Sequence, residues 1–254
     1  MKIDQGLVAF ITGASSGLGF ETAKDLLDIG VKCFLTDRDP IENEFLQKYP
    51  KDRILFRNLD ITNEEDIKLA VQECVKYFGH IDVLLNCAGI ATMQHVTDDS
   101  FNPKTITNIF NINVIGSLNM SKYVALQMVK QQKENQQKKD YLIINVSSAA
   151  ANGAPSGLSI YGATKGAILA MTLPMARDLG KFGIRVVCIS PGYFNTKMGK
   201  STPKQLYDYM ARTSCLGRHG EPQEFSQAVQ GVMECQFLTG THFYLDSCYA
   251  SPHF

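Results

Sequence analysis

Short apolar runs bounded by turn residues alternate along the chain with longer segments whose apolar residues recur at helical spacing. This alternation is typical of repeated strand–helix–strand units, in which right-handed helical crossovers join parallel strands. The predicted strands are residues 7–12, 31–36, 53–58, 81–86, 141–146 and 184–190. The predicted helices are residues 20–29, 42–49, 64–78, 106–130 and 159–179.

These elements predict one α/β domain over residues 1–254, with a doubly wound, mostly parallel sheet of the Rossmann type and helices on both faces. A chain of 254 residues can bury a large core, and no linker or repeat divides it. Asn63 or Thr62 is expected to cap the helix at residues 64–78. Residues 130–140, KQQKENQQKKD, are expected to form a solvated helix end rather than a binding patch.

The composition is ordinary for a soluble globular protein, with 44% hydrophobic and 20% charged residues. The 25 basic and 25 acidic residues balance, so the net charge indicates neither a nucleic-acid nor a membrane-surface partner. No apolar run approaches membrane length, and no membrane insertion is predicted. The first residues lead almost at once into a predicted strand, which leaves no room for a separate targeting peptide.

Neither the cysteines nor the histidines have the spacing of metal ligands. The seven cysteines never form a C-x-x-C pair, and their odd number favours free thiols in a reducing compartment over a disulfide framework. The five histidines form no H-E-x-x-H or comparable set, so no metal site is predicted.

A glycine-rich segment, TGASSGLG at residues 12–19, lies between the first predicted strand and its helix. Glycines allow a tight turn and let a pyrophosphate approach the helix N-terminus, where free N–H groups and the helix dipole favour anions. The spacing differs from the dinucleotide fingerprint G-x-G-x-x-G and is weak evidence alone. The candidate cofactor-binding residues here are Thr12, Gly13, Ser15, Ser16, Gly17, Leu18 and Gly19.

Asp37 stands at the end of the second predicted strand, 18 residues beyond Gly19. A carboxylate at this place accepts hydrogen bonds from the adenosine ribose diol and repels a 2′-phosphate, which favours NAD over NADP. Arg38 keeps NADP open, because a basic neighbour can accommodate that phosphate. The alternative for Asp37 is an exposed loop acid.

Two further groups follow strands in the same way. Asp60 and Ile61 come after the third predicted strand and could hold the adenine. Asn86, Ala88 and Gly89 follow the fourth, where the backbone could approach the cofactor. Both groups fall at carboxyl ends of strands, where open α/β sheets bind ligands.

Tyr161 and Lys165 stand one helical turn apart, so a phenol and an ammonium group reach the same point in space. A phenol is a weak acid with an ordinary pKa near 10, and a neighbouring cation favours the phenolate. Ser148, thirteen residues before the tyrosine, could hold a substrate oxygen beside it. This set can move a proton on or off an alcohol, although Y-x-x-x-K alone also occurs as a solvated helix pair.

Together these motifs resemble the classical short-chain dehydrogenases/reductases over essentially the whole chain. The resemblance rests on TGASSGLG, Asp60-Ile61, NCAG at residues 86–89, Asn113, Ser148, Tyr161-x-x-x-Lys165 and Pro191-Gly192. Within the family, the strings GLVAFITG, LNCAGIA, MTLPMARDL, GIRV and FLTG are most similar to the type II 3-hydroxyacyl-CoA dehydrogenases, also called 17β-hydroxysteroid dehydrogenases type ten. The resemblance implies a cofactor half at about residues 1–150 and a substrate and catalytic half at about residues 140–254.

The resemblance also implies a catalytic tetrad of Asn113, Ser148, Tyr161 and Lys165. Tyr161 would take the hydroxyl proton while a hydride leaves the same carbon for the nicotinamide, and Ser148 would hold the developing oxyanion. Lys165 would bind the nicotinamide ribose and lower the pKa of Tyr161, and Asn113 would anchor a water that connects the lysine to solvent. Ser147 and Asn111 are the neighbouring alternatives, and the family spacing favours Ser148 and Asn113.

The resemblance assigns the segment that covers the nicotinamide to Pro191, Gly192, Phe194 and Thr196, with Thr196 at the carboxamide. Two regions depart from the closest relatives. The chain between Gly89 and Asn113 is shorter at the place where relatives insert a loop beside the acyl-CoA site. The C-terminal Asp246-Ser-Cys-Tyr lacks a glycine that many relatives carry after the aspartate.

The resemblance therefore implies an NAD-dependent enzyme that interconverts (3S)-3-hydroxyacyl-CoA and 3-oxoacyl-CoA thioesters. The nearest alternative is a 3-oxoacyl carrier-protein reductase or a hydroxysteroid dehydrogenase of the same family. An alternative of another class is a structural subunit of a larger mitochondrial assembly. A homodimer or homotetramer, formed through the helix from residue 106 and the helix that carries Tyr161, and a mitochondrial matrix location also rest on resemblance alone, with the cytoplasm as the other possibility.

Overall fold

The computed structural model describes residues 1–134 and 139–249, and its central feature is one parallel sheet. Within the described residues the sheet has seven strands in the order β3-β2-β1-β4-β5-β6-β7. The strands are β1 Val8–Thr12, β2 Lys32–Asp37, β3 Ile54–Asn58, β4 Val83–Asn86, β5 Tyr141–Val146, β6 Ile184–Pro191 and β7 Thr241–Leu245. The chain builds the sheet outward from β1 in both directions, with β2 on one side and β4 on the other. Doubly wound sheets bind ligands at this reversal of strand order.

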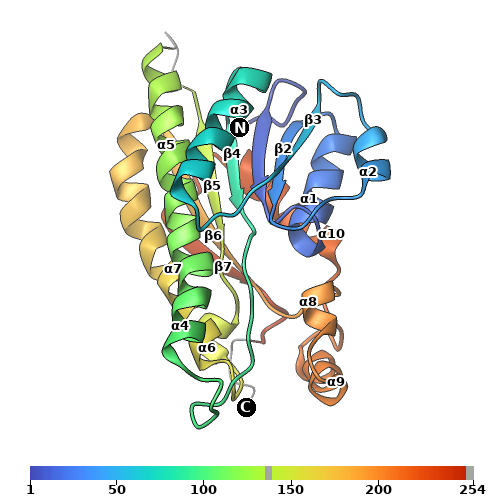
Figure 1. Ribbon diagram of the computed structural model, residues 1–254. Helices are drawn as coiled ribbons and strands as arrows, with labels where there is room; N and C mark the ends of the chain where they lie inside the picture. The colour runs from blue at the N-terminus through green and yellow to red at the C-terminus, as the bar shows by residue number, and fades with distance from the viewer. Residues whose placement is uncertain (135–138, 250–254) are drawn as a thin grey trace.

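Helices cover both faces of the sheet, as predicted (Figure 1). One face carries α1 Gly17–Asp28, α2 Asn43–Gln47 and α10 Pro222–Glu234, and the other carries α3 Glu64–Phe78, α5 Ser117–Glu134 and α7 Ser159–Leu179. Shorter helices lie beyond the carboxyl ends of the strands: α4 Pro103–Phe110, α6 Ala150–Gly153, α8 Lys197–Lys200 and α9 Lys204–Thr213 (Figure 1). A 3₁₀ turn, Gly180–Phe182, joins α7 to β6.

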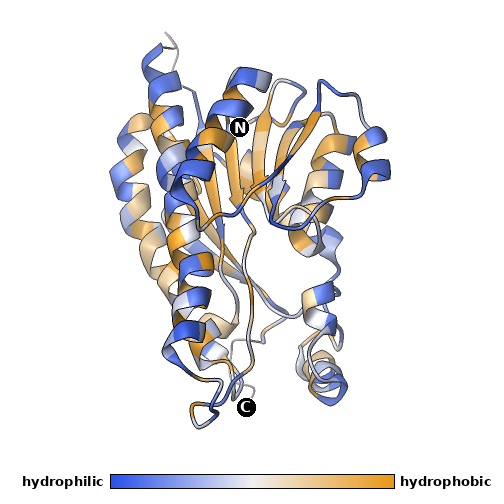
Figure 2. Ribbon diagram, viewed as in Figure 1, coloured by the Kyte–Doolittle hydropathy of each residue, from blue (hydrophilic) through white to orange (hydrophobic). Residues whose placement is uncertain are grey.

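Each face of the sheet is closed by its own apolar core. Leu26 of α1 and Phe225 of α10 are fully buried on one side, and Ile67 of α3 and Met120 of α5 are fully buried on the other. Figure 2 shows the strands largely in the hydrophobic colours, whereas hydrophilic and hydrophobic colours alternate along the helices. Each such side chain contributes roughly 1.5–3 kcal/mol by leaving water, so the two cores hold the strand ends that carry the site in fixed positions.

The structure confirms the predicted α/β fold and matches the predicted bounds of β5, α3 and α7. Asn63, not Thr62, caps α3, because its Oδ1 accepts the N–H groups of Glu65 and Asp66 at 3.1 and 3.2 Å. The predicted helix 20–29 begins earlier, at Gly17, so its first turn lies inside the glycine-rich segment. Of the polar run 130–140, residues 135–138 lie outside the described residues.

The predicted helix at residues 106–130 is helical throughout, but it is not one uniform α-helix. A π-helix, Asn111–Gly116, separates α4 from α5, and α4 begins at Pro103 with Asn102 as its cap. The wider turn is stabilised by tertiary contacts: Asn113 bonds to the Ile90 backbone, and Gly116 passes so close to Ile61 that a Cβ there would lie 2.7 Å from Ile61 Cδ1. Strand β7 and helices α6, α8, α9 and α10 were not predicted.

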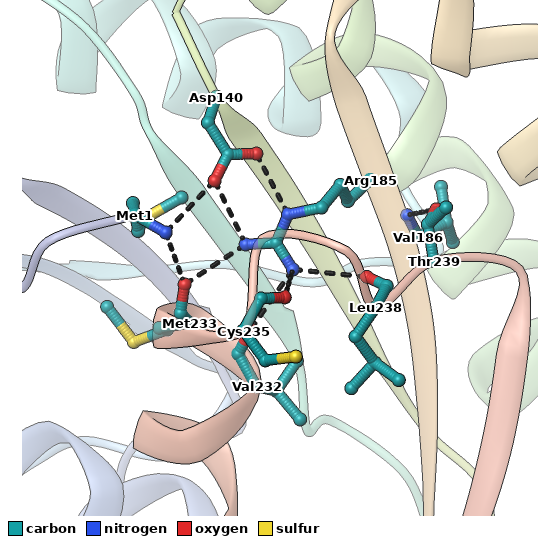
Figure 3. A network of polar contacts seen from close by, with 9 residues as sticks. All are labelled: Met1, Asp140, Arg185, Val186, Val232, Met233, Cys235, Leu238 and Thr239. Atoms are coloured by element: carbon teal, nitrogen blue, oxygen red, sulfur yellow. Dashed lines mark hydrogen bonds and ion pairs between the residues drawn. The ribbon is translucent and has the colours of Figure 1, made fainter.

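The last part of the chain is tied to the sheet by the Arg185 side chain of β6, which is 6% exposed (Figure 3). Its Nε donates to Asp140 Oδ1 at 2.8 Å, and its Nη1 and Nη2 donate to the carbonyls of Val232, Met233, Cys235 and Leu238 at 3.0–3.2 Å. These carbonyls belong to the end of α10 and the turn that follows it. The guanidinium therefore fixes the entry into β7.

Every helix among the described residues is too short or too polar to cross a bilayer.

Candidate active site

A cleft of about 540 Å³ opens at the carboxyl ends of the strands. It runs from the glycine-rich segment after β1 to the N-terminal half of α7 and the segment after β6. The predicted site residues that line it are Gly13, Ser16, Gly17, Leu18, Gly19, Asp37, Asp60, Ile61, Ala88, Gly89, Ser148, Tyr161, Lys165, Pro191, Gly192, Phe194 and Thr196. The structure therefore brings the two groups of candidate residues, for cofactor and for catalysis, into one cavity.

The glycine-rich segment forms a cradle that side chains would fill. At Gly13, whose φ is +68°, an added Cβ would lie 2.8 Å from the backbone nitrogen of Ala88. At Gly19 an added Cβ would lie 2.3 Å from the Gly13 carbonyl oxygen. The glycines thus let the segment pack tightly on itself and on the loop after β4, and they place the first turn of α1 at the cleft. The free N–H groups of a helix N-terminus fit a pyrophosphate.

Asp37 lies at the end of β2 and faces the same cradle. Its carboxylate accepts the N–H of Ser15 at 2.9 Å and the N–H of Asp39 at 3.1 Å, which holds it at the cleft. The neighbouring Arg38 side chain is 68% exposed and stands 3.9 Å from Asp39, outside any hydrogen bond to Asp37. A fixed carboxylate at this place fits a ribose diol.

Asp60 and Ile61 border the cleft after β3. Asp60 Oδ1 accepts the N–H and hydroxyl of Thr62 at 2.9 and 2.7 Å, so the carboxylate is engaged in its own turn. The apolar Ile61 and the adjacent Leu59 provide a wall against which a flat ring can pack.

Three of the predicted cofactor residues do not line the cleft. Thr12 is 1% exposed, and its hydroxyl accepts the Ala88 N–H at 3.1 Å, so it supports the loop after β4 from behind. Ser15 uses its N–H for Asp37 and its hydroxyl for the Asp39 carbonyl at 2.8 Å.

Asn86 is the third. Its side chain points from β4 toward the helical layer and donates to Ser121 at 2.9 Å and to Asn145 at 3.0 Å. Successive side chains of a strand point to opposite faces, so a residue at the end of a strand need not face the ligand edge. Its position makes Asn86 a support of the sheet edge rather than a ligand contact.

Tyr161 and Ser148 meet inside the cleft. A hydrogen bond joins their side chains, and the Ser148 hydroxyl also accepts the Ala150 N–H at 3.1 Å. Burial raises the pKa of Tyr161 above its usual value, while the Ser148 hydrogen bond lowers it. Ser147 faces the other way, because its hydroxyl donates to the Lys165 carbonyl at 2.7 Å.

Lys165 lies behind Tyr161 and is 6% exposed. Its Nζ stands 5.7 Å from the Tyr161 ring centre and donates to the Val146 carbonyl at 2.9 Å. Burial lowers the pKa of Lys165 to about 8. Burial is the largest influence on the pKa of Tyr161 and raises it, and the Ser148 hydroxyl lowers it. The lowering of this pKa by Lys165 together with the nicotinamide stays a prediction.

Asn113 lies outside the cleft lining, next to the lysine. Its amide bonds to both backbone groups of Ile90 at 2.9 Å and donates to the Thr164 hydroxyl at 3.1 Å. A Cβ on Gly89 would stand 3.2 Å from Asn113 Oδ1 and 3.6 Å from Lys165 Nζ, so a side chain there would crowd the Asn113 amide. Asn111 is exposed on the same π-helix, which makes Asn113 the one that faces the catalytic groups.

The segment after β6 covers the other side of the cleft. Gly192 donates to the Leu245 carbonyl at 3.0 Å, and Thr196 caps α8 by accepting the Gly199 N–H at 3.1 Å. Phe194 is 6% exposed and packs edge-on against Phe225. Pro191, Gly192, Phe194 and Thr196 therefore form one anchored strip along the cleft.

Sequence reasoning missed the aromatic residues that close the catalytic end. Tyr193 and Tyr249 both line the cleft, with ring centres 5.6 Å apart and nearly perpendicular planes. Met198, Thr202 and Pro203 of the α8–α9 segment line it as well. Tyr193 directly follows Pro191-Gly192, which is the one sequence signal that could have marked it.

The arrangement can bind an anionic dinucleotide along the glycine cradle and exchange a proton at the Tyr161 oxygen. Ser148 is placed to share a substrate oxygen with that phenol, and Lys165 supplies a cation whose protonation changes near neutral pH. These are the requirements of an alcohol–carbonyl interconversion in which the hydride goes to a separate carrier.

Comparisons of the sequence with known proteins point to the same chemistry. Residues 7–206 match the family described as short chain dehydrogenase. The chain is 36% identical over 247 residues to 3-hydroxyacyl-CoA dehydrogenase type-2 from Bos taurus, covering 95% of this chain and 94% of that relative. It is 30% identical over 251 residues to ipsdienol dehydrogenase from Ips pini, covering 95% and 96%.

A solved structure supports the fold. The short-chain dehydrogenase/reductase from Serratia marcescens superposes with a TM-score of 0.86 at 24% identity, covering 98% of this chain and 100% of that one. The family match extends over the glycine cradle, Ser148, Tyr161 and Lys165. The chain belongs to the short-chain dehydrogenase/reductase family, a family of oxidoreductases that use a nicotinamide cofactor.

Proposed function

We propose that this protein is an NAD-dependent dehydrogenase that interconverts (3S)-3-hydroxyacyl-CoA and 3-oxoacyl-CoA thioesters. The observation that carries the proposal is the hydrogen-bonded pair of Tyr161 and Ser148 in the same cleft as the glycine cradle. The relatives named 3-hydroxyacyl-CoA dehydrogenase type-2, which align with this chain over 94% of their length, supply the substrate class.

In this mechanism the first turn of α1 and Asp37 hold the two ends of the dinucleotide's adenosine diphosphate. A bound oxidised nicotinamide would supply the acceptor for the hydride of the carbon that bears the substrate hydroxyl. Tyr161, in its phenolate form, removes the proton of that hydroxyl, and Ser148 donates a hydrogen bond to the same oxygen. Burial raises the pKa of Tyr161. The positive charge of a bound oxidised nicotinamide would favour the phenolate and offset that effect.

Lys165 and Asn113 support this proton transfer. The Lys165 ammonium would bind the ribose of the nicotinamide, and its pKa of about 8 lets it exchange a proton near neutral pH. Asn113, fixed at the Ile90 backbone, holds the turn beside the lysine and would anchor a water that links it to solvent.

NAD is proposed over NADP because of the fixed carboxylate of Asp37. A 2′-phosphate at that place would meet a negative charge that already accepts two backbone N–H groups. Arg38, the residue that could accommodate the phosphate, stands near Asp39 and is largely exposed.

The test is turnover of acetoacetyl-CoA with NADH, compared with NADPH, carrier-protein thioesters and hydroxysteroids in one panel. We expect turnover of the CoA thioester with NADH and a much lower rate with NADPH. A preference for NADPH with a carrier-protein thioester, or for a steroid, would replace the proposed substrate with that alternative. NADH binding without turnover of any substrate in the panel would favour a structural subunit.

We further propose a homodimer or homotetramer in the mitochondrial matrix. Large apolar side chains are exposed on the two helices expected to form the contact, among them Leu118 and Leu126 of α5 and Leu173 of α7. The mass in solution, measured by light scattering for the wild type and for Leu126→Asp, tests the assembly. Subcellular fractionation tests the compartment, with the cytoplasm as the alternative.

A further inference from the structure

Two exposed cysteines face each other at the edge of the catalytic end. Cys215 lies just after α9, and Cys248 lies just after β7. The Cys215 N–H donates to the Ser247 carbonyl at 2.9 Å, so a single peptide hydrogen bond separates the two backbones at this point. Cys248 is the next residue after Ser247, so this bond brings its segment beside Cys215. A disulfide needs Cα atoms roughly 4.4–6.8 Å apart.

A second bond holds the same two segments. The Leu216 N–H donates to the Ser247 side chain at 2.8 Å. Two successive N–H groups, those of Cys215 and Leu216, are therefore bonded to Ser247. Hydrogen bonding to the Cys248 side chain raises the pKa of the Cys215 thiol above its usual value. The two sulfur atoms are therefore neighbours in the reduced protein.

The backbone is bent to bring Cys248 to this position. Ser247 and Cys248 have φ of 53° and 64°, in the left-handed region that residues other than glycine rarely adopt. The Ser247 side chain is the one that accepts the Leu216 N–H. The turn at Asp246-Ser-Cys-Tyr thus builds the contact with Cys215.

We propose that Cys215 and Cys248 form a reversible disulfide on exposure to a low-molecular-weight disulfide such as oxidised glutathione. The thiolate of one cysteine attacks a glutathione sulfur, forms a mixed disulfide and releases one glutathione thiolate. The thiolate of the second cysteine then attacks the mixed disulfide at the protein sulfur, forms the Cys215–Cys248 bond and releases the second glutathione. The two protein protons pass to the two glutathione thiolates, so two thiols are oxidised and one disulfide is reduced.

The bond would join the α9 end of the cleft to the end of β7. Tyr249 follows Cys248 directly, lines the cleft and packs on Tyr193. Fixing Cys248 to Cys215 therefore fixes the segment that carries Tyr249 at the catalytic end. An exposed disulfide of this kind is readily reduced, so in a reducing compartment the bond would form only under oxidising conditions and would reopen afterwards.

The test is peptide mapping of the full-length protein after equilibration with oxidised glutathione, without reductant. Trypsin separates Cys215, in residues 213–218, from Cys248, in residues 219–254, because no lysine or arginine follows Arg218. We expect a cross-linked pair of these peptides, the loss of two accessible thiols per chain, and recovery of both with dithiothreitol.

Cys235 provides the matched control, since it is exposed and lies on the same tryptic peptide as Cys248. Cys235→Ser should leave the cross-link intact, while Cys215→Ser and Cys248→Ser should each abolish it. A cross-link that disappears in Cys235→Ser, or glutathione adducts that persist on both cysteines, would overturn the proposal.

Discussion

Replacing Ser148 with alanine separates the roles assigned to the hydroxyl beside Tyr161. The variant removes the group that hydrogen-bonds the phenol and that would hold the substrate oxygen. Removing one donor to a developing oxyanion typically reduces kcat by about 10²–10³, or about 2.7–4 kcal/mol of transition-state stabilisation. We expect a loss of this size for Ser148→Ala.

The same variant should move the pH dependence. Oxidation needs the phenolate, so its rate rises with pH through the pKa of Tyr161. Burial raises that pKa and the Ser148 hydrogen bond lowers it, so deleting the hydroxyl leaves the raising effect unopposed. The rising limb of the kcat profile should therefore shift to higher pH in Ser148→Ala.

The assay is NADH formation or consumption followed by absorbance across the pH range, with thermal unfolding as a check of the fold. Ser147→Ala is the matched control, because the adjacent hydroxyl donates to the Lys165 carbonyl and not to the phenol. Ser147→Ala should lower the thermal stability, and it should leave the rising limb of the kcat profile at the wild-type pH. A normal kcat and an unshifted profile in Ser148→Ala would refute the assigned role of this hydroxyl.

Three further outcomes are expected. Asp37→Ser should narrow the preference for NAD over NADP, measured as the ratio of kcat/KM values, and an unchanged ratio would contradict the role of this carboxylate. Arg185→Met should lower the free energy of unfolding by roughly 3–5 kcal/mol in urea titrations, since it removes the buried cation that pairs with Asp140 and donates to four carbonyls. Burial alone would raise the pKa of Asp82, but hydrogen bonds and charges from His80 and Lys139 hold this pKa below its usual value. The Asp82 carboxylate therefore stabilises the folded state fully above about pH 3.9, the pKa of an unfolded aspartate, and this stabilisation is lost as the pH falls through the lower pKa of the folded state. Asp82→Asn should remove that part of the acid-induced loss of stability, and a wild-type slope in the variant would count against it.

Much of the fold could be predicted because the sheet is buried on both faces. The strand residues 141–146 are buried throughout, so the sequence shows them as an apolar run with clear ends. Helix α3 combines an apolar face with a cap at Asn63 and an acidic first turn, and all three signals are local. Local signals of this kind do not depend on the rest of the molecule.

The missed elements lack such signals or depend on distant contacts. Strand β7 lies at the sheet edge and is only partly buried, so THFYL shows no apolar run. The π-helix continues the helical spacing of its neighbours, and what holds it is the bond between Asn113 and Ile90, 23 residues apart. Helix α10 begins with Pro222 and a capping box of Glu221 and Glu224, a local signal that could have been recognised.

The candidate site divides in the same way. Gly13, Asp37 and Tyr161 follow from spacing relative to strands and helices, and the cleft contains all three. The direction of the Asn86 side chain could not be predicted, because the residue after it already belongs to a loop. Tyr249 reaches Tyr193 only through the parallel pairing of β6 with β7, which the sequence did not reveal.

The pKa of Tyr161 also required the structure. From the sequence, a cation one turn away should lower it, yet burial raises it and the Lys165 ammonium donates to the Val146 carbonyl. The balance between desolvation and charge depends on how deeply the phenol is buried. The spacing of residues along the sequence does not reveal that depth.

The most direct test of the account is the Tyr161→Phe variant, assayed for both turnover and cofactor binding. Phenylalanine keeps the ring and removes the hydroxyl that exchanges the proton. Acetoacetyl-CoA reduction should fall to background while NADH binds with wild-type affinity, measured by its fluorescence. Substantial turnover in this variant would contradict the claim that the Tyr161 oxygen carries the proton of the reaction.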